Sequence, residues 1–300
     1  MKKRIITTLL FLCFFALNAN AQEGLSSFST KYTGDLPLYK ISQTDLNGKV
    51  RSIVVKSGEG EEKFGDVSFT DYDNVTLIVY SVNENGYLMN ITNFGLIGGD
   101  RTVKSKEVFL YDNKNRLSKI EEYDADGSCS RSYQFQYNQN NVVTSAVVKN
   151  GLEKDYMEWD YDKNGNHVKT RYYDGYGNLT DTYISECKYT YYDNGKVKTI
   201  TDYYDNQPVS SNTLDTKGRI IEAIVYKEGV WKRKIKYSYN QRGFPSGYEM
   251  FNIVNVEDNL SVSYKYVFDN QGNPIKAWGV DNDNSMGNTV GLRTYDIDYW

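Results

Sequence analysis

The sequence predicts an all-β protein: an extended antiparallel β-meander of tandem hairpin repeats, either curled or split into two sheets. Three observations predict it. A turn phrase recurs, consisting of an aromatic residue, Asp or Asn, two variable residues, Gly or Asn, one further residue and an aliphatic residue. Aromatic and polar side chains alternate ahead of these turns, which is the period of a strand. The 300 residues include 28 Tyr but only 4 Pro, a composition that favours strands.

The turn phrase is most regular between residues 107 and 275. Successive copies lie 22 to 31 residues apart, and a second, less regular turn falls between them. Each period therefore holds two strands of about eight residues, and the chain holds roughly sixteen strands or more. The copy at Tyr192-Asp193 reads as one residue shorter than the others. The Asp or Asn position of the copies is occupied by Asp112, Asn138, Asp162, Asp193, Asp215, Asn240 and Asp269.

The spelling of the phrase predicts what its residues do. An Asp or Asn side chain accepts a hydrogen bond from a backbone N–H two residues on, and Gly or Asn supplies the positive φ of a type I turn closed by a bulge. We therefore expect these Asp residues to be structural and the glycines to have positive φ. The residues in question are Asp112, Asp162, Asp193 and Asp269, with Gly165, Gly195 and Gly272.

The ends of the chain predict export and a single repeat domain. A basic start, an apolar run over residues 5–17 and the small-x-small pattern Ala19-Asn20-Ala21 predict a cleaved signal peptide over residues 1–21, with an uncleaved membrane anchor as the alternative. Residues 22–43 are expected to be an edge strand or tether, and residues 44–300 the repeat domain. The mature protein would be periplasmic, on the cell surface or extracellular.

The net charge argues against two classes of partner. Removing residues 1–21 removes three basic side chains and no acidic ones, which leaves 32 Lys and Arg against 39 Asp and Glu, or −7. Binders of nucleic acid carry basic faces, so no nucleic acid is expected. An acidic chain is also repelled by an anionic membrane surface.

The phrase resembles the YD repeat of RHS-type proteins, and Tyr173-Asp174-Gly175-Tyr176-Gly177-Asn178-Leu179 is the best single match. The resemblance covers residues 107–275, with echoes back to about residue 44. It implies long antiparallel sheets that curl into a hollow shell, which encloses a toxin in large members. The chain is too short for a closed shell, so that encapsulating role is not expected. Short bacterial repeat proteins with Gly-x-Leu hairpins are similar as well.

Catalytic and metal chemistry find little support. Asp160-x-Asp162-x-Asn164-Gly165 begins like a calcium loop, but Arg171 stands where the bidentate Glu belongs, so we expect ordinary turns. His167 is the only histidine, which argues against zinc and against a catalytic triad. Carboxylate pairs exist, but sequence does not place them in a cleft. We expect no enzyme activity, no metal and no cofactor.

Two alternatives concern the cysteines and the membrane. Cys129 and Cys187 remain after export and either form a disulfide or stay as isolated thiols. A membrane barrel would show lipid-facing apolar residues at alternate positions. Counting back by twos from Trp300 meets Asp298, Asp296 and Thr294, so a membrane-spanning role is not expected.

The function expected is that of a non-enzymatic binding module. Tyrosine and tryptophan faces stack on ligands, and repeats present such residues in rows across a broad surface. The ligand class would be a glycan or another cell-envelope component, such as an envelope protein. A structural scaffold or protein–protein interaction repeat with no small ligand is the alternative. The candidate binding residues are Trp159, Tyr161, Tyr173, Tyr176, Tyr237 and Tyr239.

Overall fold

The computed structural model describes residues 28–33, 36–41, 47–97, 100–139, 143–150, 153–164, 166–179, 185–253, 259–282 and 289–300. The expected signal peptide, residues 1–21, lies outside these ranges, and so does Gly165. No helix among the described residues is long and apolar enough to cross a membrane.

The described chain is almost entirely β-structure, as the sequence predicts. Its strands are β1 (Phe28–Thr33), β2 (Leu36–Ile41), β3 (Val50–Lys63), β4 (Asp66–Phe69), β5 (Thr76–Val82), β6 (Leu88–Ile97), β7 (Asp100–Tyr111), β8 (Leu117–Asp124), β9 (Cys129–Tyr137), β10 (Val143–Asn150), β11 (Glu153–Tyr161), β12 (His167–Tyr173), β13 (Ser185–Tyr191), β14 (Val197–Tyr204), β15 (Gln207–Leu214), β16 (Ile220–Lys227), β17 (Val230–Tyr239), β18 (Pro245–Asn252), β19 (Leu260–Phe268), β20 (Pro274–Asp281) and β21 (Thr289–Tyr299). A 3-10 turn, η2 (Tyr72–Asn74), precedes β5.

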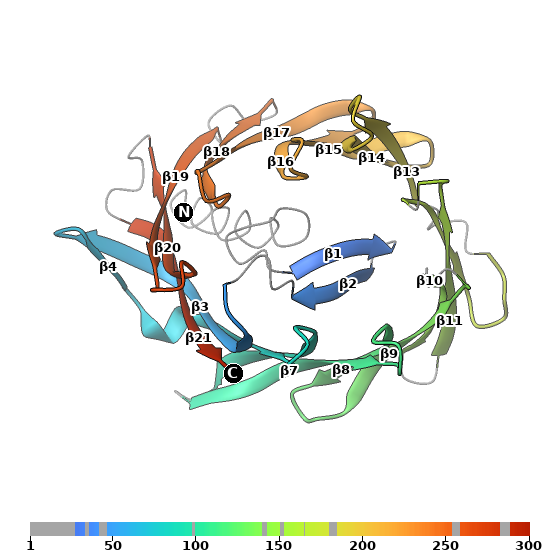
Figure 1. Cartoon of the computed structure of the whole chain (residues 1–300), viewed down its shortest axis with the longest axis horizontal. Helices are drawn as coiled ribbons and strands as arrows, with labels where there is room; N and C mark the ends of the chain where they lie inside the picture. The colour runs from blue at the N-terminus through green and yellow to red at the C-terminus, as the bar shows by residue number, and fades with distance from the viewer. Residues whose placement is uncertain are drawn as a thin grey trace.

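The meander closes on itself into an antiparallel barrel of 18 strands (Figure 1). Closure is made by β21 and β3, which pair from Thr289 opposite Glu61 to Tyr299 opposite Val50. Of the two expected forms, curled or split into two sheets, the sheet takes the curled one, and the curl continues until the first and last strands pair. The reason is geometric: each strand is twisted relative to its neighbour, and pairing the first and last strands removes both exposed edges.

A short branch leaves the barrel at β3. This long strand pairs with β5 through Ser52 to Ser57 and with β4 through Gly60 to Lys63, so β4 forms a hairpin beyond the end of β5. A Cβ at Gly60 would lie 2.9 Å from the Cβ of Leu292, so glycine here permits close packing. The cluster beneath the hairpin consists of Val67, Trp278 and Leu292 with Phe69 and Val280.

The predicted turns are present, and most of their Asp residues act as expected. In the turn after β7, Asp112 Oδ1 accepts hydrogen bonds from the backbone N–H groups of Lys114 and Arg116, both at 2.9 Å. Asp162 and Asp269 bond their own turns in the same way. The glycines at 195 and 272 have φ of +78° and +85°, as predicted.

The expectation for Asp193 was wrong. The turn after β13 is closed by Tyr192 N donating to Lys196 O and by Gly195 N donating to Tyr192 O. These bonds match those of the other turns, so the loop is no shorter, and Tyr192 takes the place of the usual Asp. No hydrogen bond from the turn to Asp193 is among those of the described residues, and its side chain is exposed. Because Tyr191 and Tyr192 are adjacent, either one can be matched to the aromatic position of the turn phrase, and the two matches differ by one residue.

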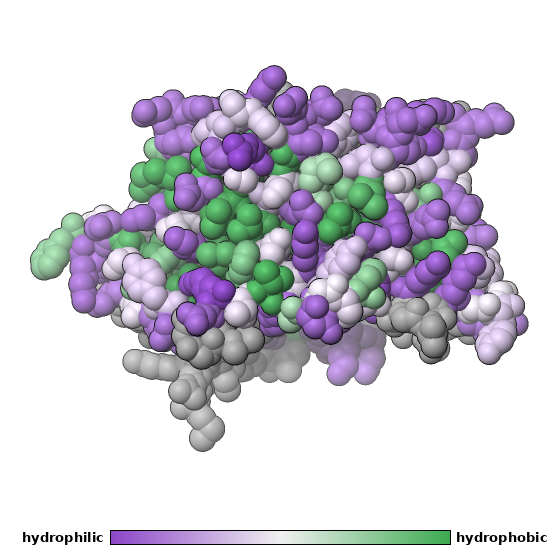
Figure 2. Space-filling view, turned by 90° about the horizontal axis from the view of Figure 1, so that it is seen from below, coloured by the Kyte–Doolittle hydropathy of each residue, from purple (hydrophilic) through white to green (hydrophobic). Residues whose placement is uncertain are grey.

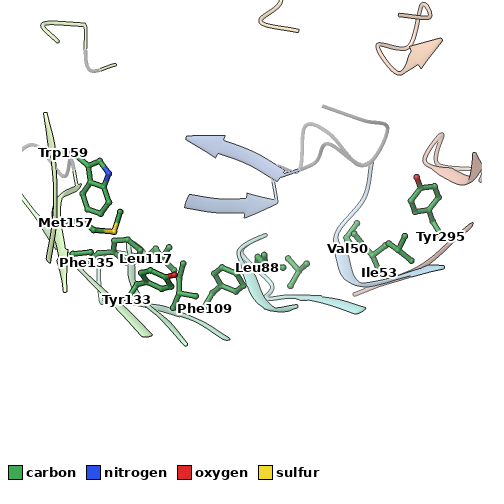
Figure 3. Packing of buried hydrophobic residues seen from close by; sticks show 14 of the residues in the cluster. Val50, Ile53, Leu88, Phe109, Leu117, Tyr133, Phe135, Met157, Trp159 and Tyr295 are labelled. Atoms are coloured by element: carbon green, nitrogen blue, oxygen red, sulfur yellow. The ribbon is translucent and has the colours of Figure 1, made fainter. Parts of the chain in front are cut away.

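The two faces of the barrel wall differ in chemistry. Figure 3 shows the apolar side chains of the main core pointing to the inside of the ring, among them Ile53, Leu88 and Phe109, all fully buried. The outer wall carries charged pairs such as Lys169–Glu186 and Lys234–Glu222. Figure 2 shows part of this outer wall, where hydrophilic side chains follow one rim and hydrophobic ones gather in patches.

The N-terminal strands β1 and β2 form a two-stranded sheet of their own. Figure 1 shows this hairpin within the ring of barrel strands rather than as part of it. The two strands account for part of residues 22–43, the segment expected to be an edge strand or tether.

Candidate functional site

Most inner-face tyrosines of the repeats form a hydrogen bond through the side-chain hydroxyl. Each donates to the main-chain carbonyl of the residue that begins a strand after a turn, at 2.6 to 2.8 Å. The pairs are Tyr111 to Leu88, Tyr137 to Leu117, Tyr189 to His167, Tyr239 to Ile220 and Tyr266 to Pro245. These bonds join neighbouring hairpins, so these hydroxyls serve the fold.

Tyr161 breaks this rule. It ends β11 as Tyr137 ends β9, but its hydroxyl is buried without a hydrogen-bond partner. Burial raises the pKa of its phenol well above the ordinary value. An unpaired buried hydroxyl costs roughly 1–3 kcal/mol, so the position is one where a further partner would be stabilising.

Trp159 lies two residues earlier on the same face. Its side chain is 3% exposed, its ring stacks on Phe135 with centroids 6.4 Å apart, and its Nε1 donor has no acceptor. Figure 3 shows the indole projecting to the inner side of β11. Two adjacent inner-face side chains, Trp159 and Tyr161, therefore hold unsatisfied polar atoms.

Polar side chains continue from Tyr161 across the next strands. Tyr161 pairs with His167 on β12, and Cys187 on β13 pairs with Asp202 on β14. The Sγ of Cys187 lies 3.8 Å from Nδ1 of His167 and 3.1 Å from Oδ1 of Asp202. We call Tyr161, His167, Cys187 and Asp202 the inner-face row.

Hydrogen bonds fix the side chains of His167 and Asp202, the first and last of the three polar residues that follow Tyr161 in the row. The Nε2 of His167 lies 2.9 Å from the Oγ1 of Thr170, which is itself fully buried. Burial lowers the pKa of His167, against the opposing influence of Asp202 and Asp160. Oδ2 of Asp202 accepts from the hydroxyl of Ser210 at 2.5 Å, and its other oxygen accepts from the Cys187 thiol.

The row offers a carboxylate acceptor at Asp202, to which the Cys187 thiol donates. Asp202 receives only neutral donors from Cys187 and Ser210, and the ion pairs found among the described residues do not include it. The row thus offers a carboxylate whose charge is not matched by a neighbouring Lys or Arg.

The six candidate binding residues do not converge on one place. Trp159 and Tyr161 lie at the row, and Tyr237 lies on the inner face of β17 against Tyr248, with ring centroids 6.4 Å apart. The hydroxyl of Tyr239 donates to Ile220. On the other side of the wall, Tyr173 donates to Glu158, and Tyr176 lies in an exposed turn.

Sequence reasoning missed the rest of the row. The sequence assigns no binding role to His167, Cys187 or Asp202, and nothing in their spacing indicates that strands β12 to β14 bring them together. The one usable signal was the substitution of His167 where other copies have an aliphatic residue. Cys129 is exposed on β9 and Cys187 is on β13; both are free thiols in the structure.

In the segment that begins like a calcium loop, the carboxylates are engaged in bonds to other side chains and to the turn backbone. Asp160 faces outward and forms an ion pair with Arg171, while Asp162 caps its turn and accepts from Tyr191 at 2.8 Å. Asp162 lies in the turn beyond the end of β11, so the two carboxylates are held by different partners, Asp160 by Arg171 on the wall and Asp162 by its own turn. Within the described residues, no group of three or more acidic, His or Cys side chains is arranged to hold a metal ion.

A second titratable pair lies on the inner face elsewhere. Glu107 on β7 is directly opposite Glu122 on β8. Burial raises the pKa of Glu107 to about 7, and the neighbouring charge of Glu122 adds to the rise. This pair bears on stability and pH, and it lies apart from the inner-face row.

Comparison with known proteins gives distant likenesses only. No family model matches the chain, and no curated protein matches it. It is similar to a porin-like protein from Bacteroides uniformis, with a TM-score of 0.41 and 12% identity over 83% of this chain and 98% of that one. A porin-like protein from Bacteroides vulgatus gives 0.26 and 9%, over 85% and 99%.

A Tc holotoxin pore from Photorhabdus luminescens is also similar, with a TM-score of 0.28 and 11% identity. The match covers 72% of this chain and 14% of the toxin chain, so this protein spans a small part of that relative's length.

Proposed function

We propose that the protein is an exported, non-enzymatic binding module that takes a glycan or another cell-envelope component on the inner face of β11 to β14. The observation that carries this proposal is the Nε1 donor of Trp159, which is buried without an acceptor. A ligand oxygen placed there would remove an unfavourable term of roughly 1–3 kcal/mol.

The surroundings of Trp159 suit a sugar. Sugar oxygens accept hydrogen bonds from N–H and O–H donors, while nearby carboxylates accept from sugar hydroxyl groups. The inner-face row supplies an unpaired phenol at Tyr161 and a carboxylate at Asp202. We also propose that the hairpins are YD-like repeats, since repeated hairpins place such groups on one continuous face.

The location proposed for this module is aqueous and outside the cytoplasm. The N-terminal segment over residues 1–21 has the pattern of a signal peptide. The ion pairs on the outer wall, such as Arg171 with Asp160, would be costly against lipid. We therefore propose that the barrel is not membrane-spanning and does not bind nucleic acid.

The experiment is a glycan array and envelope-extract pull-down with the mature protein, followed by titration of each hit against wild type and Trp159→Phe. Trp159→Phe keeps the aromatic ring and removes the Nε1 donor. Trp231→Phe, on β17 beside Lys234, is the matched control. We expect affinity to fall about ten-fold for Trp159→Phe, the scale of one hydrogen bond, and to be unchanged for the control.

The second candidate function is a structural scaffold that binds no small ligand. The bonds from tyrosine hydroxyls to neighbouring hairpins favour it, because most of the repeat tyrosines are thereby committed to the fold. A folded protein that binds nothing on the array or in the pull-down would favour the scaffold over the binding module.

A further inference from the structure

Around the candidate site, the basic side chains lie on the outer face of the barrel wall, whereas the inner face carries an unmatched carboxylate. On β11 and β12 the basic side chains lie on the outer face, where Lys169 pairs with Glu186 and Arg171 with Asp160. Lys188 on β13 stacks over Tyr203, which alternates with Asp202 and so lies on the outer face as well. The inner face of these strands presents the carboxylate of Asp202.

Asp155 adds a second inner-face carboxylate. It pairs with Val148 of β10 and alternates with the buried Met157, so it lies on the same face as Trp159. The one basic group within the row is the imidazole of His167, and burial lowers its pKa, which leaves the ring uncharged at neutral pH. The inner face between β10 and β14 is therefore negatively charged.

A negative, aromatic-lined face selects its ligand by charge. An anionic sugar, such as a uronic acid or a phosphorylated one, would be repelled by Asp202. A cation would be attracted both by the carboxylate and by the faces of aromatic rings. The neutral donors Cys187 and Ser210 orient the Asp202 carboxylate without cancelling its charge.

The length of the row sets the size of the ligand. Tyr161, His167, Cys187 and Asp202 lie on four successive strands, which are spaced about 4.8 Å apart, so the row spans roughly 14 Å. A single sugar ring is too short to touch both ends.

We infer that the ligand of this site is a short oligosaccharide with a free amino group, bound with its ammonium at Asp202 and a ring oxygen or hydroxyl at Trp159 and Tyr161. The inference rests on the proposed binding function and deepens it. Charge complementarity with Asp202 identifies the amine, and the unpaired donor of Trp159 identifies the acceptor-rich end.

A matched pair of probes tests it: the trimer of glucosamine and the trimer of N-acetylglucosamine, which differ only in acetylation of the amine. Both are titrated by calorimetry at pH 6, where an amine of ordinary pKa is charged. We expect the glucosamine trimer to bind at least ten-fold tighter, and the preference to weaken as salt is raised.

The variant that isolates the charge is Asp202→Asn, which keeps an oxygen acceptor for the Ser210 hydroxyl. It should remove the preference for the free amine, so that the two trimers bind alike. Glu186→Gln, on the outer face of the neighbouring strand, is the control and should keep the preference.

The two failures are distinguishable. Equal binding of both trimers to wild type would overturn the inference about the amine while leaving the glycan-binding function in place. If neither trimer binds the folded wild-type protein, the inference is overturned; the binding function is overturned as well only if the glycan array and the envelope pull-down are also blank. Retention of the full preference in Asp202→Asn would show that the amine is read elsewhere and would overturn the assignment.

Discussion

The hydroxyl of Tyr137 donates a 2.6 Å hydrogen bond to the main-chain carbonyl of Leu117 and so joins β9 to the start of β8. The guanidinium of Arg116 stacks over the same ring, 4.4 Å from its centroid, and the Asp112 carboxylate holds that guanidinium at 2.6 Å. One tyrosine thus links its own hairpin to the preceding turn. Burial raises the pKa of Tyr137 to about 12.

The first prediction compares two tyrosines at equivalent places. Tyr137→Phe removes the bond to Leu117 and should lower the free energy of unfolding by about 1 kcal/mol. Tyr161→Phe removes a hydroxyl that has no partner and should leave stability unchanged or slightly raised. Urea denaturation of both variants measures the difference, and equal losses would contradict the distinction between them.

The second prediction concerns the turn carboxylates. Asp269 accepts from the backbone of Gln271 and Asn273 and from the Tyr299 hydroxyl, so Asp269→Ala should cost about 1–3 kcal/mol. Asp193 bonds no turn backbone, and Asp193→Ala should stay within about 0.5 kcal/mol of wild type. Thermal melts with ligand titrations decide between roles: an Asp269→Ala variant that melts normally but loses binding would make this turn a site.

The third prediction uses the tip of the β3–β4 hairpin. Phe64 is fully exposed and has φ of +54°, ahead of Gly65 at +83°. This is the backbone of a type I′ turn, in which Asn or Asp is preferred at the first position. Phe64→Asn should therefore raise the free energy of unfolding by roughly 0.5–1 kcal/mol. A drop in the unfolding midpoint would show that the phenylalanine makes a contact worth more than the relieved strain.

A fourth prediction tests the same conformational preference in the opposite direction. Gly272 has φ of +85° in the turn between β19 and β20, and an added Cβ would lie 3.3 Å from the Nδ2 of Asn47. Gly272→Val should cost about 1–3 kcal/mol, because a β-branched residue is strained at positive φ. Gly272→Asn, which tolerates this conformation, should cost less. If the two variants unfold at the same denaturant concentration, backbone strain is not the cause.

The fifth prediction is a pH dependence set by Glu107. Its pKa in the folded protein is about 7, raised above the ordinary 4.5, because burial and the charge of Glu122 disfavour the ionised form. The unfolded chain then loses its proton at lower pH than the folded one, so this group destabilises the fold progressively as pH rises from about 4.5 to 7. The full effect is on the order of 3 kcal/mol.

Glu107→Gln should remove that dependence and stabilise the protein at pH 7.5. Glu121→Gln is the control, since Glu121 pairs with Lys119 and Tyr123. Denaturant melts from pH 4.5 to 8 measure both. A wild type whose stability does not fall over this range would show that Glu107 ionises normally in the fold.

Local chemistry in the sequence determined the strands and turns of this protein. The alternation of aromatic and polar residues assigns a strand and its two faces, because side chains of a strand point alternately to either side. The Asp and Gly of each turn phrase act within five residues of one another, so their hydrogen bonds and positive φ depend on no distant contact. Even the error at Asp193 was a local one, caused by the neighbouring Tyr191 and Tyr192.

Only the tertiary structure decided closure and the candidate site. Whether β21 meets β3 depends on twist accumulated over every strand between them, and no single residue encodes that sum. Closure then creates contacts such as Asn273 Nδ2 donating to Asn47 O, across 226 residues. Likewise, His167, Cys187 and Asp202 meet because three strands pair in one register, and a shift of one residue would turn Cys187 to the outer face.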